Sequence, residues 1–167
     1  MAAWAEEGYS QDIAEAVNKF LLKYMEGGAK MFTFDQDEGV FRTTLKSEGT
    51  ARLLGCVVVI ADSFFRTYVV SPIGVDPSEP SKLAAMAEFI CRVNYGLFGG
   101  GFEMDFNDGE IRFRSFVDCS GGLIPSEALI GNSIVAGTRM FERYLPGIKD
   151  VLFNGTSPKE AVEKCEN

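Results

Sequence analysis

The fold is decided by the stretch Phe102-Glu103-Met104-Asp105-Phe106-Asn107-Asp108-Gly109-Glu110-Ile111-Arg112-Phe113-Arg114. Apolar and charged side chains alternate on both sides of Asp108-Gly109, which is the period of a strand with one buried face. The pair Asp-Gly suits a tight two-residue turn, because both central residues of that turn need positive φ. The stretch therefore predicts a β-hairpin.

The turn also predicts how the two strands of this hairpin are aligned. The expected cross-strand partners are Phe106 and Ile111, Met104 and Phe113, Asp105 and Arg112, and Glu103 and Arg114. Each pair of opposite charges contributes about 0.2–1 kcal/mol. A shift of one residue would place charged side chains on the core face, so the alternation favours this register.

Length and composition indicate one globular domain covering residues 1–167, with residues 1–9 and 156–167 peripheral. The chain is 46% hydrophobic, contains 14 Phe and has a net charge of −8. An acidic chain without a basic cluster argues against binding to nucleic acid or to an anionic membrane. The first residues lack the pattern of a signal peptide, and no apolar run reaches 18 residues. We therefore expect a cytoplasmic protein.

The residue types present exclude several kinds of active site. The chain contains no His, which removes Ser-His-Asp and Cys-His catalysis and histidine metal sites. Its four cysteines are far apart in the sequence and are expected to be structural residues of a reduced protein. We expect no catalytic, cofactor-binding or metal-binding residue, no cofactor and no enzyme activity.

Hydrophobic periodicity outlines the rest of the chain. The segments expected to be helical are residues 10–25, a helix with Pro80 in its first turn, a long helix from Pro125-Ser126 to Leu145, and a short helix after Ser157-Pro158. Pro146-Gly147 is expected to stop or kink the long helix. The remaining strands are expected at residues 31–35, 40–46, 53–61 and 64–71. The order α-β-β-β-β-α-β-β-α predicts an α+β fold with helices on one face of an antiparallel sheet.

The middle pair of strands carries apolar side chains on both faces. In the expected pairing, Cys56, Val58 and Ile60 share one face with Phe65, Thr67 and Val69. The opposite face carries a single charge, Arg66, and the candidate interface residues Val57, Val59, Phe64, Tyr68 and Val70. If helices cover only one face, these five residues lie open and mark an interaction surface. The alternative is that loops or the N-terminal segment with Trp4 cover them.

Three motifs have a chemical interpretation that we consider weaker than a structural one. Residues 96–101 are glycine-rich, but they run from a helix to a strand, the reverse of a phosphate-binding loop. Residues 35–39 resemble the start of a calcium loop, but the twelfth position is Lys46. Glu103 and Asp105 could form an acid–base pair, but they are better explained as solvated partners of arginines.

Much of residues 10–155 resembles the YbjN family, which is described as regulators of bacterial sensory transduction. The resemblance rests on the helix ending at Asn94, the Gly101–Asp105 and Asp108–Arg114 segments, Arg143–Ile148, Val151–Gly155, and the earlier hairpin of Phe34-Asp35 and Gly39–Arg42. It implies a fold like that of class I type III secretion chaperones, paired into a dimer. It brings no catalytic or cofactor residues. The three consecutive glycines 99–101 depart from the ordinary turn expected there.

These observations predict a non-enzymatic cytoplasmic binding module, chaperone-like or regulatory, that engages a protein or peptide through an apolar surface. The expected partners are a second copy of the chain, in a homodimer, and an unidentified protein or peptide, with no nucleic acid and no membrane. The alternative is a regulatory domain that binds a small ligand in a cleft near the Gly99–Gly101 corner.

Overall fold

The computed structural model describes residues 8–24, 32–47 and 53–167. Its four helices are α1 (Gln11–Tyr24), α2 (Pro80–Asn94), α3 (Glu127–Phe153) and α4 (Pro158–Glu166). Its six strands are β1 (Phe32–Asp35), β2 (Val40–Lys46), β3 (Leu53–Ile60), β4 (Phe64–Val70), β5 (Gly101–Met104) and β6 (Ile111–Asp118). The predicted α+β class and the predicted order of elements are confirmed, including the short helix at the C-terminus.

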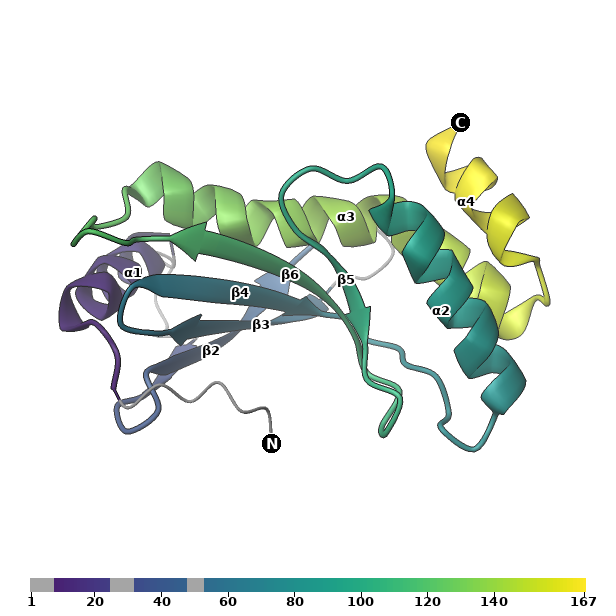
Figure 1. The fold of residues 1–167 in the computed structure, drawn as a ribbon, viewed down its shortest axis with the longest axis horizontal. Coiled ribbons are helices and arrows are strands. Elements are labelled where there is room, and N and C mark those ends of the chain that lie inside the picture. Colours follow the sequence, from purple (N-terminus) through teal and green to yellow (C-terminus); the bar gives the residue numbers. More distant parts are fainter. Residues whose placement is uncertain (1–7, 25–31, 48–52) are drawn as a thin grey trace.

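The strands form one antiparallel sheet in the order β1-β2-β3-β4-β6-β5 (Figure 1). The last hairpin is inserted with β6 against β4, so β5 lies at the edge of the sheet. The central pairing has the predicted register, with Val58 opposite Thr67 and Val59 opposite Arg66. Because side chains alternate along a strand, this register sets which residues of β3 and β4 share each face.

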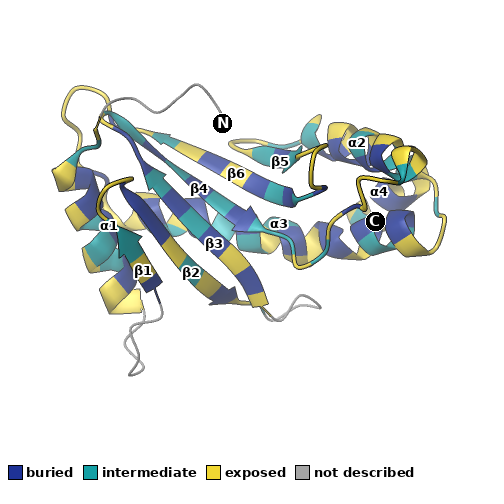
Figure 2. Ribbon diagram, turned by 90° about the horizontal axis from the view of Figure 1, so that it is seen from below, coloured by how far each residue is buried: buried dark blue, intermediate teal, exposed yellow. Residues whose placement is uncertain are grey.

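Helices cover one face of the sheet. Helix α3 runs along that face with α1 beside its N-terminal part, and α2 and α4 pack together beyond the end of the sheet where β5 lies (Figure 1). Figure 2 shows buried and less buried residues alternating along β2, β3, β4 and β6, which is the pattern of a sheet with one covered face. No described helix lies on the opposite face, which we call the outer face.

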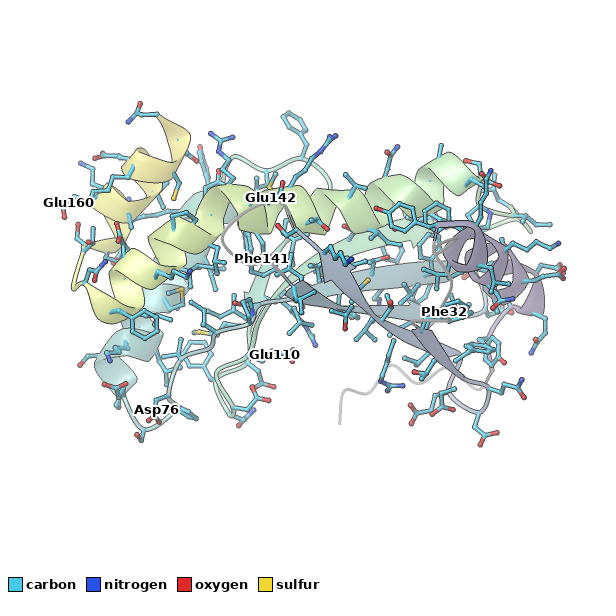
Figure 3. All side chains as sticks on the ribbon, turned by 180° about the vertical axis from the view of Figure 1, so that it is seen from behind. Phe32, Asp76, Glu110, Phe141, Glu142 and Glu160 are labelled. Carbon is cyan, nitrogen blue, oxygen red and sulfur yellow. The ribbon has the colours of Figure 1, made fainter. Side chains whose placement is uncertain are left out.

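Aromatic side chains fill the core between α3 and the sheet. Phe102 of β5 packs edge-on against Phe113 of β6 and against Phe141 of α3, with ring centroids 5.1 and 5.2 Å apart. Figure 3 shows Phe141 pointing from α3 toward the sheet. Helix α3 comes close to β4 at Gly137, where an added Cβ would lie 2.5 Å from a methyl carbon of Val69. A side chain at this position would therefore crowd Val69.

Helix α3 is longer than the sequence predicts. It continues through Pro146 to Phe153, so of the two expected effects of Pro146-Gly147, a stop or a kink, the stop is wrong. Proline removes one backbone hydrogen bond from a helix. Pro146 is exposed, and Leu145, Ile148 and Leu152 stay buried at helical spacing on either side of it. Tertiary packing of this apolar stripe holds the helix together despite the lost bond.

The β5–β6 register differs from the prediction by two residues. Met104, not Phe106, lies opposite Ile111, and the remaining pairs shift with it. The turn is longer than two residues because the β5–β6 loop is held against the segment before α2. The Val75 N–H of that segment donates to the Gly109 carbonyl oxygen at 3.0 Å. Asp105 leaves the strand, and its side chain accepts a hydrogen bond from the Asn107 N–H at 2.8 Å. A shift of two keeps every side chain on its face, so alternation alone does not detect it.

Candidate interaction surface

The outer face brings together the five residues predicted as an interface. Val57 lies opposite Tyr68 and Val59 opposite Arg66 on neighbouring strands β3 and β4. The candidate residues are all intermediate in burial, whereas the inward-facing residues between them are fully buried. Their position follows from alternation, since the core takes Cys56, Val58 and Ile60 from the same strand. The surface is thus a patch of half-buried apolar side chains at the centre of the sheet.

Phe116 belongs to this patch, although the sequence reasoning did not include it. It lies on β6 opposite Arg66, and 52% of its surface is exposed. Its ring centroid is 5.2 Å from that of Phe64, so the two rings are in contact. Strict alternation along β6 places Ile111, Phe113 and Ser115 on the inner face, and it therefore places Phe116 on the outer face.

Arginines line the apolar patch. The guanidinium carbon of Arg66 lies 4.7 Å from the centroid of the Phe64 ring, and that of Arg112 lies 4.3 Å from the Tyr68 ring. Both distances are within the range of cation–π attraction. Arg112 also forms ion pairs with Glu103 at 3.1 Å and with Glu110 at 3.6 Å. The outer face therefore combines aromatic, aliphatic and cationic side chains.

Glu103 forms ion pairs with two arginines of β6. Its two carboxylate oxygens accept hydrogen bonds from Arg112 and Arg114. The predicted pairing of Asp105 with Arg112 is wrong, because Asp105 lies in the loop. Hydrogen bonds from the backbone and side chain of Asn107 lower the pKa of Asp105, so this carboxylate holds the turn in its charged form.

The glycine corner is a tight connection beside a small cavity. Gly99 and Gly100 have φ of 66° and 120°, and a Cβ on Gly100 would lie 2.7 Å from the Arg114 carbonyl oxygen. Asn94 bridges the corner, because its side chain accepts from the Phe102 N–H at 2.8 Å and donates to the Phe102 carbonyl at 2.9 Å. A cavity of about 330 Å³ is lined by Asn94, Gly100, Gly101, Phe102, Glu103, Arg114 and Phe116.

The β1–β2 loop has the geometry of a turn. The side chain of Asp35 accepts hydrogen bonds from the N–H groups of Asp37 and Glu38 at 3.1 and 3.2 Å. Gly39 has φ of 65°. In the parts of the chain that the structure describes, no three Cys, Asp or Glu side chains gather where they could hold a metal ion. Within the same residues, no helix combines the length and apolar character needed to cross a membrane.

No protein-family model, curated protein or solved structure matches this chain.

Proposed function

We propose that this chain is a non-enzymatic cytosolic binding module, chaperone-like or regulatory, that engages a protein or peptide through its outer sheet face. The proposal includes pairing into a homodimer and membership of the YbjN family. The observation that carries it is the half-buried apolar patch of Val57, Val59, Phe64, Tyr68 and Val70, on a face without a described helix.

The composition of the patch supports a protein partner. Exposed clusters of apolar side chains mark interaction sites, because covering them removes apolar surface from water. Aromatic residues and arginines are enriched at the centres of protein interfaces, where they make the largest contributions to affinity. Phe116, Tyr68 and Arg66 are residues of these types at the centre of the sheet. A second polypeptide, either another copy or a different protein, fits this surface.

Val59→Asp tests the proposal. Val59 is half-buried on the outer face, so a carboxylate there disfavours docking while the core stays intact. We expect the wild-type chain to have the mass of a dimer by light scattering at micromolar concentration. We expect Val59→Asp to have the mass of a monomer with an unchanged circular dichroism spectrum.

Leu129→Asp is the matched control, because Leu129 is 42% exposed on α3 and distant in sequence from the sheet patch. It should leave the mass unchanged. A monomeric wild-type chain contradicts the dimer part of the proposal. Unfolding of Val59→Asp would mean that this position is simply internal.

The cavity beside Gly100 and Gly101 supports a second candidate function, the binding of a small ligand. Its polar groups are partly committed, because Asn94 bonds Phe102 and Glu103 pairs with two arginines. A panel of nucleotides and metabolites screened by thermal shift tests this candidate, since a ligand that binds the folded state raises Tm. A panel without any shift removes its support.

A further inference from the structure

Arg66 lies at the centre of the outer face and has no anionic partner among the residues that the structure describes. It is half-buried between the cross-strand neighbours Val59 and Phe116, and the Phe64 ring lies beside its guanidinium group. Its Nε is buried and has no hydrogen-bond partner, and Arg66 forms no ion pair with a described residue. A buried donor without an acceptor is unfavourable unless a ligand satisfies it.

The neighbouring arginines of the sheet differ from Arg66 in this respect. Arg42 pairs with Glu38 at 3.6 Å, and both Arg112 and Arg114 pair with Glu103. Their positive charges are therefore balanced within the chain. Among the arginines of the described sheet strands, Arg66 alone forms no ion pair with a described carboxylate.

Most of the charge on the outer face is balanced within the chain. By the alternation of the strands, the described outer face carries the basic residues Arg42, Lys46, Arg66, Arg112 and Arg114 and the acidic residues Asp35, Glu103 and Asp118. The neighbouring residues Glu38 and Glu110 pair with Arg42 and Arg112. Arg66 therefore supplies a local positive charge at the centre of the face, and an acidic group of a partner is attracted to it.

The acidic residues of the described outer face do not pair with Arg66 within the chain. Glu103 is shared by two arginines. One oxygen of Asp118 accepts hydrogen bonds from the N–H and hydroxyl groups of Ser120, and one oxygen of Asp35 accepts from two backbone N–H groups. A partner that carries an anion can therefore satisfy Arg66, and a peptide of this kind competes with a second copy for the face.

We propose that the outer face binds a segment of another protein that presents an Asp or Glu carboxylate to Arg66 and apolar side chains to the surrounding patch. This inference rests on the proposed function and names the chemistry of the partner. A guanidinium group offers two parallel donors, which match the two oxygens of a carboxylate. Phe64, Phe116 and Val59 exclude water around that contact, and water exclusion is typical of the strongest contacts in an interface.

The test selects peptides from a random phage-displayed library on the immobilised wild-type chain and measures their affinity for variants. We expect the selected peptides to share an Asp or Glu between apolar residues. Arg66→Met keeps much of the side chain's volume and removes its charge, so it should weaken binding about 10- to 100-fold. Arg66→Lys keeps the charge but loses the paired donors, and should bind with intermediate affinity.

Arg92→Met is the matched control, because Arg92 is an exposed arginine on α2 that pairs with Glu88 at 2.7 Å. It should not change peptide affinity. Circular dichroism and thermal unfolding of each variant show whether a loss of binding reflects a loss of fold.

Other results overturn the inference in distinguishable ways. The selected peptides could need Val59 but lack an acidic residue, or they could bind Arg66→Met as well as the wild-type chain. Either result leaves the proposed function standing and removes the role of Arg66. A dimer that Val59→Asp dissociates, together with no selected peptide, assigns the face to a second copy. Binding of a labelled oligo-dT at physiological salt that is lost in Arg66→Met means that the anion is a nucleic-acid phosphate. An absence of both peptide binding and dimerisation contradicts the proposed function as well.

Discussion

Two glycines of α3 have different surroundings, and this difference predicts different responses to the same substitution. An added Cβ at Gly137 would lie 2.5 Å from Val69, which is held in the sheet, whereas at Gly131 it would lie 3.3 Å from the ring of Phe20. Alanine improves helix propensity by about 1 kcal/mol at either position. Overpacking costs about 1–3 kcal/mol where the neighbours cannot move.

We therefore expect Gly137→Ala to lower the free energy of unfolding by up to about 2 kcal/mol, which is the cost of overpacking less the gain in helix propensity. Gly131→Ala serves as its control and should be neutral or stabilising by up to about 1 kcal/mol, because Phe20 is only partly buried and can shift. Urea denaturation of both variants measures the difference. Equal effects at the two positions would mean that α3 is not held against β4 at Gly137.

Cys56 is predicted to be chemically inert in the folded protein. It is 1% exposed on the inner face of β3, and burial raises the pKa of its thiol from 9.0 to about 12. The thiolate is the reactive form, so Cys56 should react with Ellman's reagent at mildly alkaline pH only after unfolding. Cys91 is exposed on α2 and should react in the native state.

The raised pKa also gives a direction for stability at alkaline pH. The folded state holds the proton of Cys56 more tightly than the unfolded state does. The stability that the protonated Cys56 thiol contributes is fully present below pH 9.0 and is lost as the pH rises toward about 12. Cys56→Ala removes this dependence, so its loss of stability between these pH values should be shallower than that of the wild-type chain. An identical slope would contradict the raised pKa.

The β5–β6 hairpin gives a test of register at the scale of an element. In the structure Phe102 is 3% exposed and contacts three aromatic rings, whereas Phe106 is 57% exposed in the loop. We expect Phe102→Ala to lower the free energy of unfolding by about 3–5 kcal/mol. Phe106→Ala should change it by less than about 0.5 kcal/mol. A large loss in Phe106→Ala would instead favour the register with Phe106 opposite Ile111.

Local patterns predicted the elements and their faces because both depend on side chains close in sequence. Helix α3 begins after Ser126 and α4 after Ser157, close to the expected starts, and the two faces of β3 and β4 are assigned correctly. The β5–β6 register was wrong because it depends on Val75, which is distant in sequence and holds Gly109 in a longer loop. The continuation of α3 past Pro146 was missed for a similar reason, since packing against other elements outweighs the local effect of proline.

The candidate surface was predictable only in its apolar part. Alternation places Val57, Val59 and Tyr68 on the outer face without any tertiary information. The isolation of Arg66 could not be predicted, because the ion pairs of its neighbours depend on register. With the predicted register, Glu103 would face Arg114 and leave Arg112 to Asp105, whereas in the structure Glu103 serves both arginines.

At the scale of the whole molecule, the balance of charges predicts how stability depends on pH. The net charge of −8 is neutralised near the sequence pI of about 4.6, so self-repulsion weakens as the pH falls from neutral. Carboxylates of turns and helix caps oppose this gain in stability at low pH, because hydrogen bonds lower their pKa values. They are Asp76, Asp105, Asp118, Asp150 and Glu160. Their stabilisation is present above the ordinary values of 3.8 for Asp and 4.5 for Glu, and it is lost as the pH falls through the lowered values.

We therefore expect Tm to rise slightly from pH 7 to about pH 5 and to fall below about pH 4. High salt should flatten the rise, because it screens repulsion between exposed charges. Asp118→Asn is the control for the acid limb: its amide oxygen can still accept from Ser120, but it does not titrate, so its Tm should fall less steeply. A wild-type Tm that keeps rising to pH 3 would mean that repulsion among the carboxylates outweighs the hydrogen bonds of the turns and caps.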